Sequence, residues 1–244
     1  MQTLSPQQLL RVWEVGQFQT LPQRAMTLLA ACNSLNSPEE LVAMPIGHRD
    51  ALLLSLREML FGTRFTGLSR CPDCHGKIEV DFDSSEIKMQ SEPTNKSFGV
   101  TVGEYQLTCR LPNTTDLFRA MDQRDPAAVR NELLMLCIEE AKYQTLTTAI
   151  SDLPHDVLEQ VAIELGRQDP QADISLALGC PDCRRSWEAI FDIVAFVWHE
   201  LSVEAARLLR DIHEIAAAYG WREADILALS PARRRMYLEI LANG

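Results

Sequence analysis

Cys71-Pro72-Asp73-Cys74 and Cys180-Pro181-Asp182-Cys183 are the stretches of this 244-residue chain that decide its fold. A shift of 109 positions lays the first tetrad on the second, and the same shift lays Phe82-Asp83 on Phe191-Asp192. Each tetrad lies between two segments of strand-like sequence, and the strict alternation over residues 77–82 is typical of a half-buried strand. The chain therefore carries an internal repeat of strand, Cys-x-x-Cys turn and strand.

The paired tetrads predict one zinc site. Zinc in structural sites takes four tetrahedral ligands, and a Cys-x-x-Cys turn directs two thiolates at one ion, so two turns complete the set. We expect one structural Zn2+ to be bound by Cys71, Cys74, Cys180 and Cys183. Their sulphur atoms should lie within about 4 Å of one another, the edge of a tetrahedron with zinc–sulphur bonds of about 2.3 Å. Phe82 and Phe191 should then be equivalent about a pseudo-twofold axis.

Two other interpretations of the tetrads are a redox dithiol and a pair of unrelated surface turns. A thioredoxin-type dithiol opens a helix, whereas both tetrads here precede strand-like segments. His75 could replace a cysteine as ligand, but the equivalent position in the second copy is Arg184, which favours four sulphur ligands. Compact zinc ribbons separate their pairs by roughly 15–20 residues. Because 105 residues lie between Cys74 and Cys180, residues 84–171 must form an insertion.

These patterns predict an α+β fold that is mostly helical, with a split zinc ribbon of two strand-knuckle-strand hairpins and helical lobes. Within the insertion, a hairpin is expected around Gly103, followed by helices that begin near Thr114, Pro126 and Pro154. The expected segments are an N-terminal helical segment (1–62), the first half of the ribbon (63–83), a mainly helical insertion (84–171), the second half of the ribbon (172–192), and C-terminal helices that pack with the N-terminal segment (193–244).

The composition is that of an ordinary globular protein, with 46% hydrophobic and 23% charged residues. The net charge of −11, from 34 acidic and 23 basic residues, disfavours nucleic acid as a partner because the chain repels phosphate backbones. The run Arg233-Arg234-Arg235 is more typical of a solvated surface. No apolar stretch has the length of a membrane helix, so we expect no membrane association. The N-terminus lacks a secretory profile and the seven cysteines are an odd count, which predicts a cytoplasmic protein without a disulfide framework.

No catalytic centre is visible in the sequence. His199-Glu200 and His213-Glu214 have no second histidine four positions further on, so they lack the zinc-protease pattern. The chain has neither a Gly-rich phosphate loop nor a Gly-x-Ser-x-Gly nucleophile elbow. A zinc site closed by four thiolates leaves no open position for water or substrate. We therefore expect a protein that is not an enzyme.

Trp221, Leu229 and Tyr237 are candidate partner-binding residues. Tyr219-Gly220-Trp221 combines a helix stop with two amphipathic aromatic side chains, and apolar residues continue beyond it. One hypothesis is that these residues pack on the preceding long helix as ordinary core. The other is that part of this surface is exposed and binds a partner helix. Full burial of the three side chains in the monomer would exclude docking.

Three segments carry a resemblance to a known family. The first is residues 50–62, with Ala51-Leu52-Leu53-Leu54-Ser55-Leu56-Arg57 followed by Phe61-Gly62, and the second is the first cysteine tetrad. The third is residues 180–241. The short motifs that carry the resemblance there are Trp187-Glu188, Phe191-Asp192-Ile193, His213-Glu214-Ile215, Tyr219-Gly220-Trp221 and residues 233–238. Together they resemble a zinc-knuckle family of contractile phage tail and phage-tail-like injection-system baseplate proteins, which includes hub-assembly factors.

This resemblance implies a role in assembling or forming the baseplate, by contacts with other baseplate or tail proteins and without a reaction. It leaves open whether the protein is a hub-assembly chaperone absent from the finished particle or a structural component that remains in it, and it leaves the oligomeric state open. The alternative is a zinc-ribbon module that binds nucleic acid or takes part in transcription. Such a module needs basic and aromatic ribbon strands, whereas these strands carry Glu79, Asp81, Asp83, Glu188 and Asp192.

Overall fold

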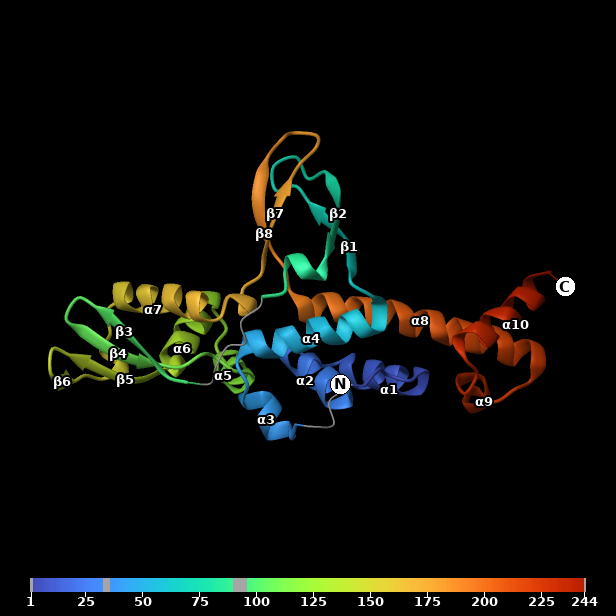
Figure 1. Cartoon of the computed structure of the whole chain (residues 1–244), viewed down its shortest axis with the longest axis horizontal. Coiled ribbons are helices and arrows are strands. Elements are labelled where there is room, and N and C mark those ends of the chain that lie inside the picture. Colours follow the sequence, from blue (N-terminus) through green and yellow to red (C-terminus); the bar gives the residue numbers. More distant parts are fainter. Residues whose placement is uncertain (1, 33–35, 90–95, 244) are drawn as a thin grey trace. The chain divides into compact units, whose positions relative to one another are not determined.

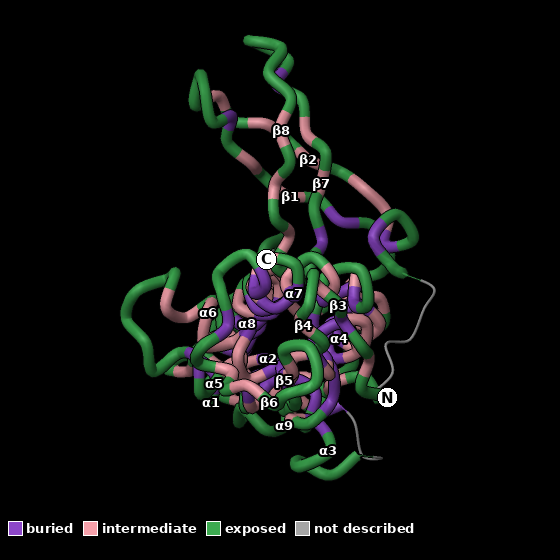
Figure 2. The backbone as a smooth tube through the Cα atoms, turned by 90° about the vertical axis from the view of Figure 1, so that its left-hand side faces the viewer, coloured by how far each residue is buried: buried purple, intermediate pink, exposed green. Residues whose placement is uncertain are grey.

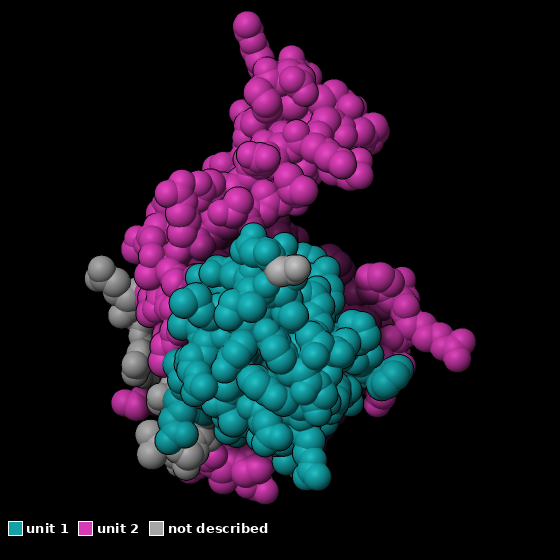
Figure 3. All heavy atoms as spheres, turned by 90° about the vertical axis from the view of Figure 1, so that its right-hand side faces the viewer, with its two compact units in different colours: residues 1–33, 194–244 teal, residues 34–193 magenta. Residues whose placement is uncertain are grey.

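The computed structural model describes residues 2–32, 36–89 and 96–243 (Figure 1). It is an α+β structure in which helices predominate, as the sequence predicts, and its described strands form three small antiparallel sheets. The chain divides into two compact units, one made of Met1–Asn33 with Val194–Gly244 and one of Ser34–Ile193 (Figure 3). We call them unit 1 and unit 2. The five segment boundaries expected from the sequence stay predictions.

Unit 1 is helical in its described part. Its helices are α1 (Pro6–Gly16), α2 (Leu21–Cys32), α8 (Ile193–Tyr219, in this unit from Val194 on), α9 (Glu223–Leu227) and α10 (Pro231–Asn243). Helix α1 begins with a capping box, in which Ser5 and Gln8 each accept a hydrogen bond from the other's backbone N–H. At its end a Cβ on Gly16 would approach the Trp198 ring to 2.1 Å, so only glycine fits there. The Arg24 guanidinium lies 4.6 Å from that ring's centroid, which joins α1, α2 and α8 at one point.

Unit 2 begins with the helices α3 and α4 and includes the two hairpins that carry the cysteine tetrads. Its first elements are α3 (Pro38–Ala43), α4 (Ile46–Phe61), β1 (Arg64–Arg70), β2 (Lys77–Asp83) and the 3-10 turn η1 (Ser84–Glu86), and its last are β7 (Ser175–Gly179) and β8 (Ser186–Ile190). Figures 1 and 2 show the β1–β2 and β7–β8 hairpins side by side. These hairpins, residues 63–83 and 172–192, form the ribbon. Among the helices of the described ranges, none combines the length and apolar composition that a membrane span requires.

The insertion between the hairpins folds as a lobe of sheet and helices. Strands β3 (Phe98–Val102), β4 (Tyr105–Cys109), β5 (Ile138–Tyr143) and β6 (Leu146–Thr147) pair in that order, and the helical elements are α5 (Thr114–Ala120), α6 (Pro126–Cys137), η2 (Ile150–Asp152), α7 (His155–Gln168) and η3 (Pro170–Ala172). The hairpin predicted around Gly103 is present, with a φ of 57° at that glycine. The sheet beyond this hairpin was not expected, because β5 starts directly after the end of α6.

The lobe has a core of its own. Its buried members are Val100, Leu107, Cys109, Leu111, Leu134, Cys137, Ile138, Ala141, Leu153, Val157, Leu158, Val161 and Leu165. Most of them come from β3, β4 and β5 and from α6 and α7, whereas Leu111 and Leu153 lie in connecting segments, so three of the four strands contribute one apolar side. The insertion is therefore a self-packed subdomain rather than a loop.

The two ends of the insertion meet beside α4. The buried Gln171 side chain accepts a hydrogen bond from the Met89 N–H at 2.7 Å and donates one to the Ile87 carbonyl at 3.3 Å. Asp169 Oδ2 accepts a hydrogen bond from the Gly47 N–H at 2.9 Å, in the first turn of α4, where no adjacent side chain caps the helix. The cap of α4 thus comes from a residue 122 positions away.

Charged groups are buried at this junction. Arg49 Nε donates a hydrogen bond to Asp50 Oδ1 at 2.7 Å, and both side chains are buried. Burial raises the pKa of Asp50 to about 6, against the lowering effect of Arg49, and the nearby carboxylates of Asp192 and Asp169 add to the rise. Burial likewise raises the pKa of Asp169, against the hydrogen bond from Gly47. The fold keeps these groups in place at a cost in desolvation.

We expect Gly47→Ala to destabilise the protein, because a Cβ at residue 47 would lie 1.8 Å from Asp169 Oδ1. Relieving the clash displaces the cap, and the expected loss in unfolding free energy is about 1–3 kcal/mol. Gly166→Ala is the matched control, since residue 166 lies inside α7 with no atom within 4 Å of a new Cβ. Helix propensity predicts a gain of about 1 kcal/mol there. Chemical denaturation measures both, and a Gly47→Ala protein as stable as the wild type would contradict the close approach.

Candidate metal centre

The two hairpins of the ribbon are built alike. Leu68 pairs with Glu79 in the first hairpin, and Ala177 pairs with Glu188 in the second. These pairs are related by the shift of 109 positions, so the internal repeat extends to the strand register. Side chains alternate between more and less exposed along all four strands, which is the pattern of a hairpin with one packed and one solvated face.

Both Cys-x-x-Cys knuckles are closed by the same two backbone hydrogen bonds. In the first, the His75 N–H donates to the Cys71 carbonyl at 3.0 Å, and in the second the Arg184 N–H donates to the Cys180 carbonyl at 3.0 Å. The N–H groups of the two leading cysteines donate to the other side of each turn at 3.0 and 2.8 Å. His75 and Arg184 both take left-handed backbone conformations, with φ of 59° and 61°. The knuckles are therefore two copies of one turn.

The knuckles bring four sulphur atoms together. The Sγ atoms of Cys71 and Cys183 are 3.5 Å apart, as are those of Cys74 and Cys180. All four Sγ atoms lie within 4.8 Å of one another. These two separations are inside the expected edge of about 4 Å, and the limit of 4.8 Å for the whole cluster is slightly wider than the edge of a zinc–thiolate tetrahedron. The structure thus unites the four cysteines that the sequence singles out, and their donor set fits a thiophilic metal ion.

The thiols of the cluster differ in burial and in pKa. Cys71 and Cys180 are buried, whereas Cys74 and Cys183 are exposed. Hydrogen bonds from backbone N–H groups, first that of Cys74, lower the pKa of Cys71 to about 7. At Cys74 the Gly76 N–H lowers the pKa, but contacts with the Cys180 and Cys71 thiols raise it to about 12 overall. One thiol ionises readily and its neighbour keeps its proton, so complete ionisation of the cluster requires a cation.

Side chains of each knuckle also reach the other knuckle. Arg185 Nε lies 3.8 Å from Asp73 Oδ2. A Cβ at Gly76 would lie 2.9 Å from Asp182 Oδ2, so the glycine makes room for that carboxylate. Asp73 corresponds to Asp182 in the repeat, and Gly76 corresponds to Arg185. The two cross-contacts therefore follow the pseudo-twofold relation of the hairpins.

Three phenylalanines join the hairpins away from the cysteines. Phe65 stacks on Phe82 with ring centroids 4.9 Å apart, and Phe191 meets both rings edge-on at 5.7 and 5.4 Å. Phe82 and Phe191 occupy the equivalent positions expected from the repeat, whereas Phe65 corresponds to Ile174. The Arg57 guanidinium lies 3.8 Å from the Phe65 ring centroid. The sequence patterns missed the contact between Phe65 and Arg57, because neither residue belongs to a repeated motif.

The candidate partner-binding residues lie in unit 1. Trp221 and Tyr237 have ring centroids 5.0 Å apart, and Tyr219 stacks on Trp221 at 5.1 Å. Trp221, Leu229 and Tyr237 are all half-buried. The full burial that would exclude docking is therefore not observed, and their role in binding a partner stays a prediction.

Residues 8–198 match the family described as T4 bacteriophage base plate protein. The chain belongs to this family. The match includes both knuckles, so the whole ribbon lies inside the family region of this base plate protein, whereas α9 and α10 lie outside it. The resemblance to phage baseplate proteins is thereby confirmed, and a baseplate-associated structural or assembly role follows. Comparison with curated proteins and with solved structures found no match.

We expect the His75→Gly variant to be more stable than the His75→Ala variant. A residue with a side chain costs about 1–2 kcal/mol in the left-handed backbone conformation, and glycine does not have that cost. The expected difference in unfolding free energy between the two variants is about 1 kcal/mol. Chemical denaturation measures it. Metal content should be unchanged in both variants, since His75 is not part of the sulphur cluster. Loss of metal in either variant would contradict the four-sulphur ligand set.

Proposed function

We propose that this protein is a zinc-stabilised assembly or structural protein of a contractile phage tail or tail-like injection-system baseplate, acting by protein–protein contacts. The observation that carries the proposal is the convergence of Cys71, Cys74, Cys180 and Cys183 inside the region that matches the base plate family. The family supports the baseplate role, and the chemistry of the cluster supports the metal.

One Zn2+ ion is the metal that the cluster favours. Thiolates are soft ligands that select zinc, copper(I) or iron–sulphur clusters. A set of four thiolates with no other ligand type is common in structural zinc sites. A divalent cation offsets the repulsion among ionised thiolates, which allows all four to lose their protons. Because the two tetrads are 105 residues apart, the ion closes a long loop and restricts the unfolded chain.

A structural role, and not catalysis, is what this site supports. Four protein thiolates complete a tetrahedral shell, so a bound zinc ion has no position for water or substrate. Within the described ranges, the cysteine cluster is the one group of three or more His, Cys, Asp or Glu side chains whose ligand atoms converge. We propose that the protein is not an enzyme and that its metal maintains the ribbon.

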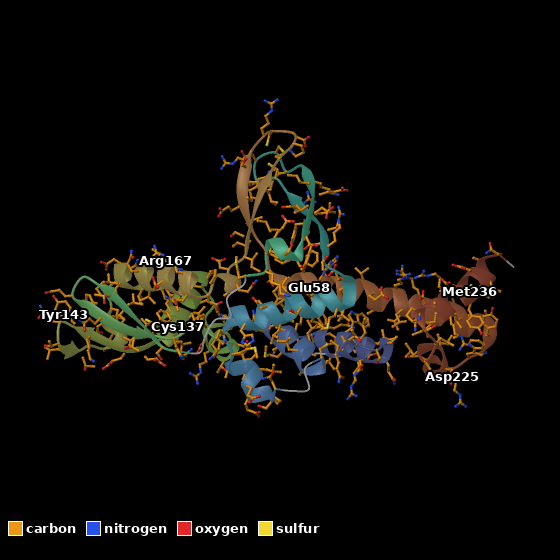
Figure 4. The ribbon with its side chains drawn as sticks, in the orientation of Figure 1. Glu58, Cys137, Tyr143, Arg167, Asp225 and Met236 are labelled. Atoms are coloured by element: carbon orange, nitrogen blue, oxygen red, sulfur yellow. The ribbon has the colours of Figure 1, made fainter. Side chains whose placement is uncertain are left out.

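Contacts with other baseplate or tail proteins provide the function in this proposal. The half-buried aromatic cluster around Trp221 and Tyr237, with Leu229 midway between these two residues in sequence, is the candidate surface for a partner helix. Met236, labelled in Figure 4, is 62% exposed and adds exposed apolar area on α10. Half-buried aromatic side chains combine a fixed position with accessible area, which suits a binding surface.

Hub-assembly chaperone and permanent component are two forms of the same role. A chaperone binds its partner during assembly and leaves, whereas a component is retained. The proposal includes both forms, because the family that the sequence resembles includes hub-assembly factors and the resemblance leaves the choice between the two forms open.

We expect the purified protein to contain about one zinc ion per chain, because two knuckles supply one tetrahedral shell. Cys180→Ser should lower zinc content to near zero and reduce thermal stability strongly, since structural zinc contributes on the order of 10 kcal/mol to the folding of zinc-finger peptides. Elemental analysis and thermal unfolding measure the two effects. Cys32→Ala is the matched control, because Cys32 is equally buried but lies outside the cluster. Iron in place of zinc, or full zinc content in Cys180→Ser, would refute the assignment.

We expect deletion of the gene to abolish assembled baseplates, and wild-type protein to restore them. Complementation with the double variant Trp221→Ala/Tyr237→Ala should fail although the variant keeps its zinc, because the aromatic surface and not the metal is altered. Electron microscopy of particles scores assembly. Mass spectrometry of purified particles then separates the two forms of the role: absence of the chain identifies a chaperone, and a stoichiometric amount identifies a component. Normal baseplates in the deletion strain would overturn the proposed function.

A further inference from the structure

Helix α10 carries apolar side chains on two opposite sides. On the side that faces α8, Leu238 and Leu241 are half-buried and line a shallow groove with Ala217. On the other side, Met236 (labelled in Figure 4) and Ile240 are 62% and 58% exposed. These two residues are one helical turn apart, so they form one apolar strip. A surface helix normally has polar side chains opposite its buried side, and α10 departs from that pattern.

The charges of α10 are arranged against its helix dipole. The first two turns contain Arg233, Arg234 and Arg235 without an acidic residue, and the last turn contains no basic residue. Cations stabilise the C-terminal end of a helix and are unfavourable at its N-terminal end. Arg234 is buried and donates a hydrogen bond to the Leu229 carbonyl at 3.1 Å, whereas Arg233 and Arg235 are exposed. Two exposed arginines are therefore placed at the end of the helix that favours them least.

Arg235 and Glu239 follow one edge of the apolar strip. They are one turn apart and both are exposed. Within the described ranges, neither side chain has an ion-pair partner. Arginine before glutamate is the less favourable order for a pair within one helix. We call Arg235, Met236, Glu239 and Ile240 the outer face of α10. It presents one cation and one anion at fixed positions beside two exposed apolar side chains.

A second copy of α10 in antiparallel orientation complements this outer face. An antiparallel pair with twofold symmetry brings each edge of the helix against the same edge of its partner. Pairing about position 237 places Arg235 of each copy opposite Glu239 of the other, and Met236 of each copy between Met236 and Ile240 of the other. The arginine-rich start of each helix then lies beside the C-terminal end of the other, where the helix dipole favours cations.

The outer face is complementary to itself in both charge and polarity. A twofold interface requires one patch in which each residue meets a suitable residue of an identical patch, and twofold dimers are the commonest oligomers. A partner surface of a single charge would satisfy only one of Arg235 and Glu239. The charge complementarity therefore identifies the occupant as a second copy of this chain.

We propose that the protein forms a weak homodimer through the outer face of α10, with the two helices antiparallel. The inference goes beyond the proposed baseplate role and does not depend on the metal. The 13 residues of α10 span about 20 Å. A contact of this length is at the low end of the size range of protein interfaces, so we expect half of the chains to be dimeric at about 10–100 μM.

Sedimentation equilibrium of the full-length protein over about 1–500 μM tests the proposal. Reducing conditions prevent disulfides between chains through the exposed Cys74 and Cys183. The wild type should show a monomer–dimer equilibrium. Met236→Lys should weaken the dimer by about tenfold or more, because each dimer would bury two ammonium groups. Val203→Lys is the matched control, since Val203 is 54% exposed on α8, and it should leave the dissociation constant within about twofold.

Charge reversal tests the orientation of the helices. Arg235→Glu and Glu239→Arg should each weaken the dimer by about threefold to tenfold, since two ion pairs become like-charge contacts. The double variant Arg235→Glu/Glu239→Arg should recover wild-type affinity. Both results together require Arg235 opposite Glu239. In a parallel pair each of these residues would meet its own copy, so a single reversal would not change the repulsion. Circular dichroism confirms that every variant keeps the helix content of the wild type.

Three results would overturn the inference. They are a wild type that stays monomeric at every concentration, equal weakening by Met236→Lys and Val203→Lys, and a double charge reversal that is as weak as the single ones. The proposed function is tested separately by zinc content and baseplate assembly. A zinc-containing, assembly-competent monomer rejects the dimer alone, whereas a dimer without zinc rejects the metal proposal alone.

Discussion

The structure of unit 2 depends on the approach of four cysteine thiols that the chain keeps far apart. Cys71 meets Cys183 and Cys74 meets Cys180 at 3.5 Å, across more than a hundred residues of sequence. Thiols at this distance repel one another once ionised, so the arrangement is stable only with a cation or with most protons retained. The cross-knuckle contacts and the phenylalanine cluster join the hairpins in the same relation.

The same constraint explains how the insertion is attached. For the knuckles to meet, the chain that leaves the first hairpin must return to the second at nearly the same place. Gln171 ties Ile87 and Met89 to the end of the insertion, and Asp169 caps α4 from there. The buried carboxylates at this junction have raised pKa values, and they fix the position of the lobe at a cost in desolvation.

The family match and the structure divide the chain differently, and the difference is informative. The match ends at residue 198, near the start of α8, and includes the whole of unit 2 with its cysteines and insertion lobe. The rest of α8 and all of α9 and α10 lie beyond it, and they carry the aromatic cluster. The candidate metal centre thus lies inside the family region, and the candidate partner surface lies outside it.

The sequence by itself determined the cysteine cluster, the repeat of the hairpins, the helix starts and the baseplate resemblance. These features depend on short spacings, alternation and capping residues. Such patterns extend over a few positions, so each segment can be interpreted without knowledge of the rest of the chain. The tertiary structure alone decided the Phe65–Arg57 contact, the Asp169 cap of α4 and the strand β5. Glu139 and Glu140 are consecutive residues of β5 and both are exposed, so this strand lacks the alternation of buried and exposed residues that marks a strand. The other features join residues up to 122 positions apart, and no local pattern records which distant side chain will fill a given place.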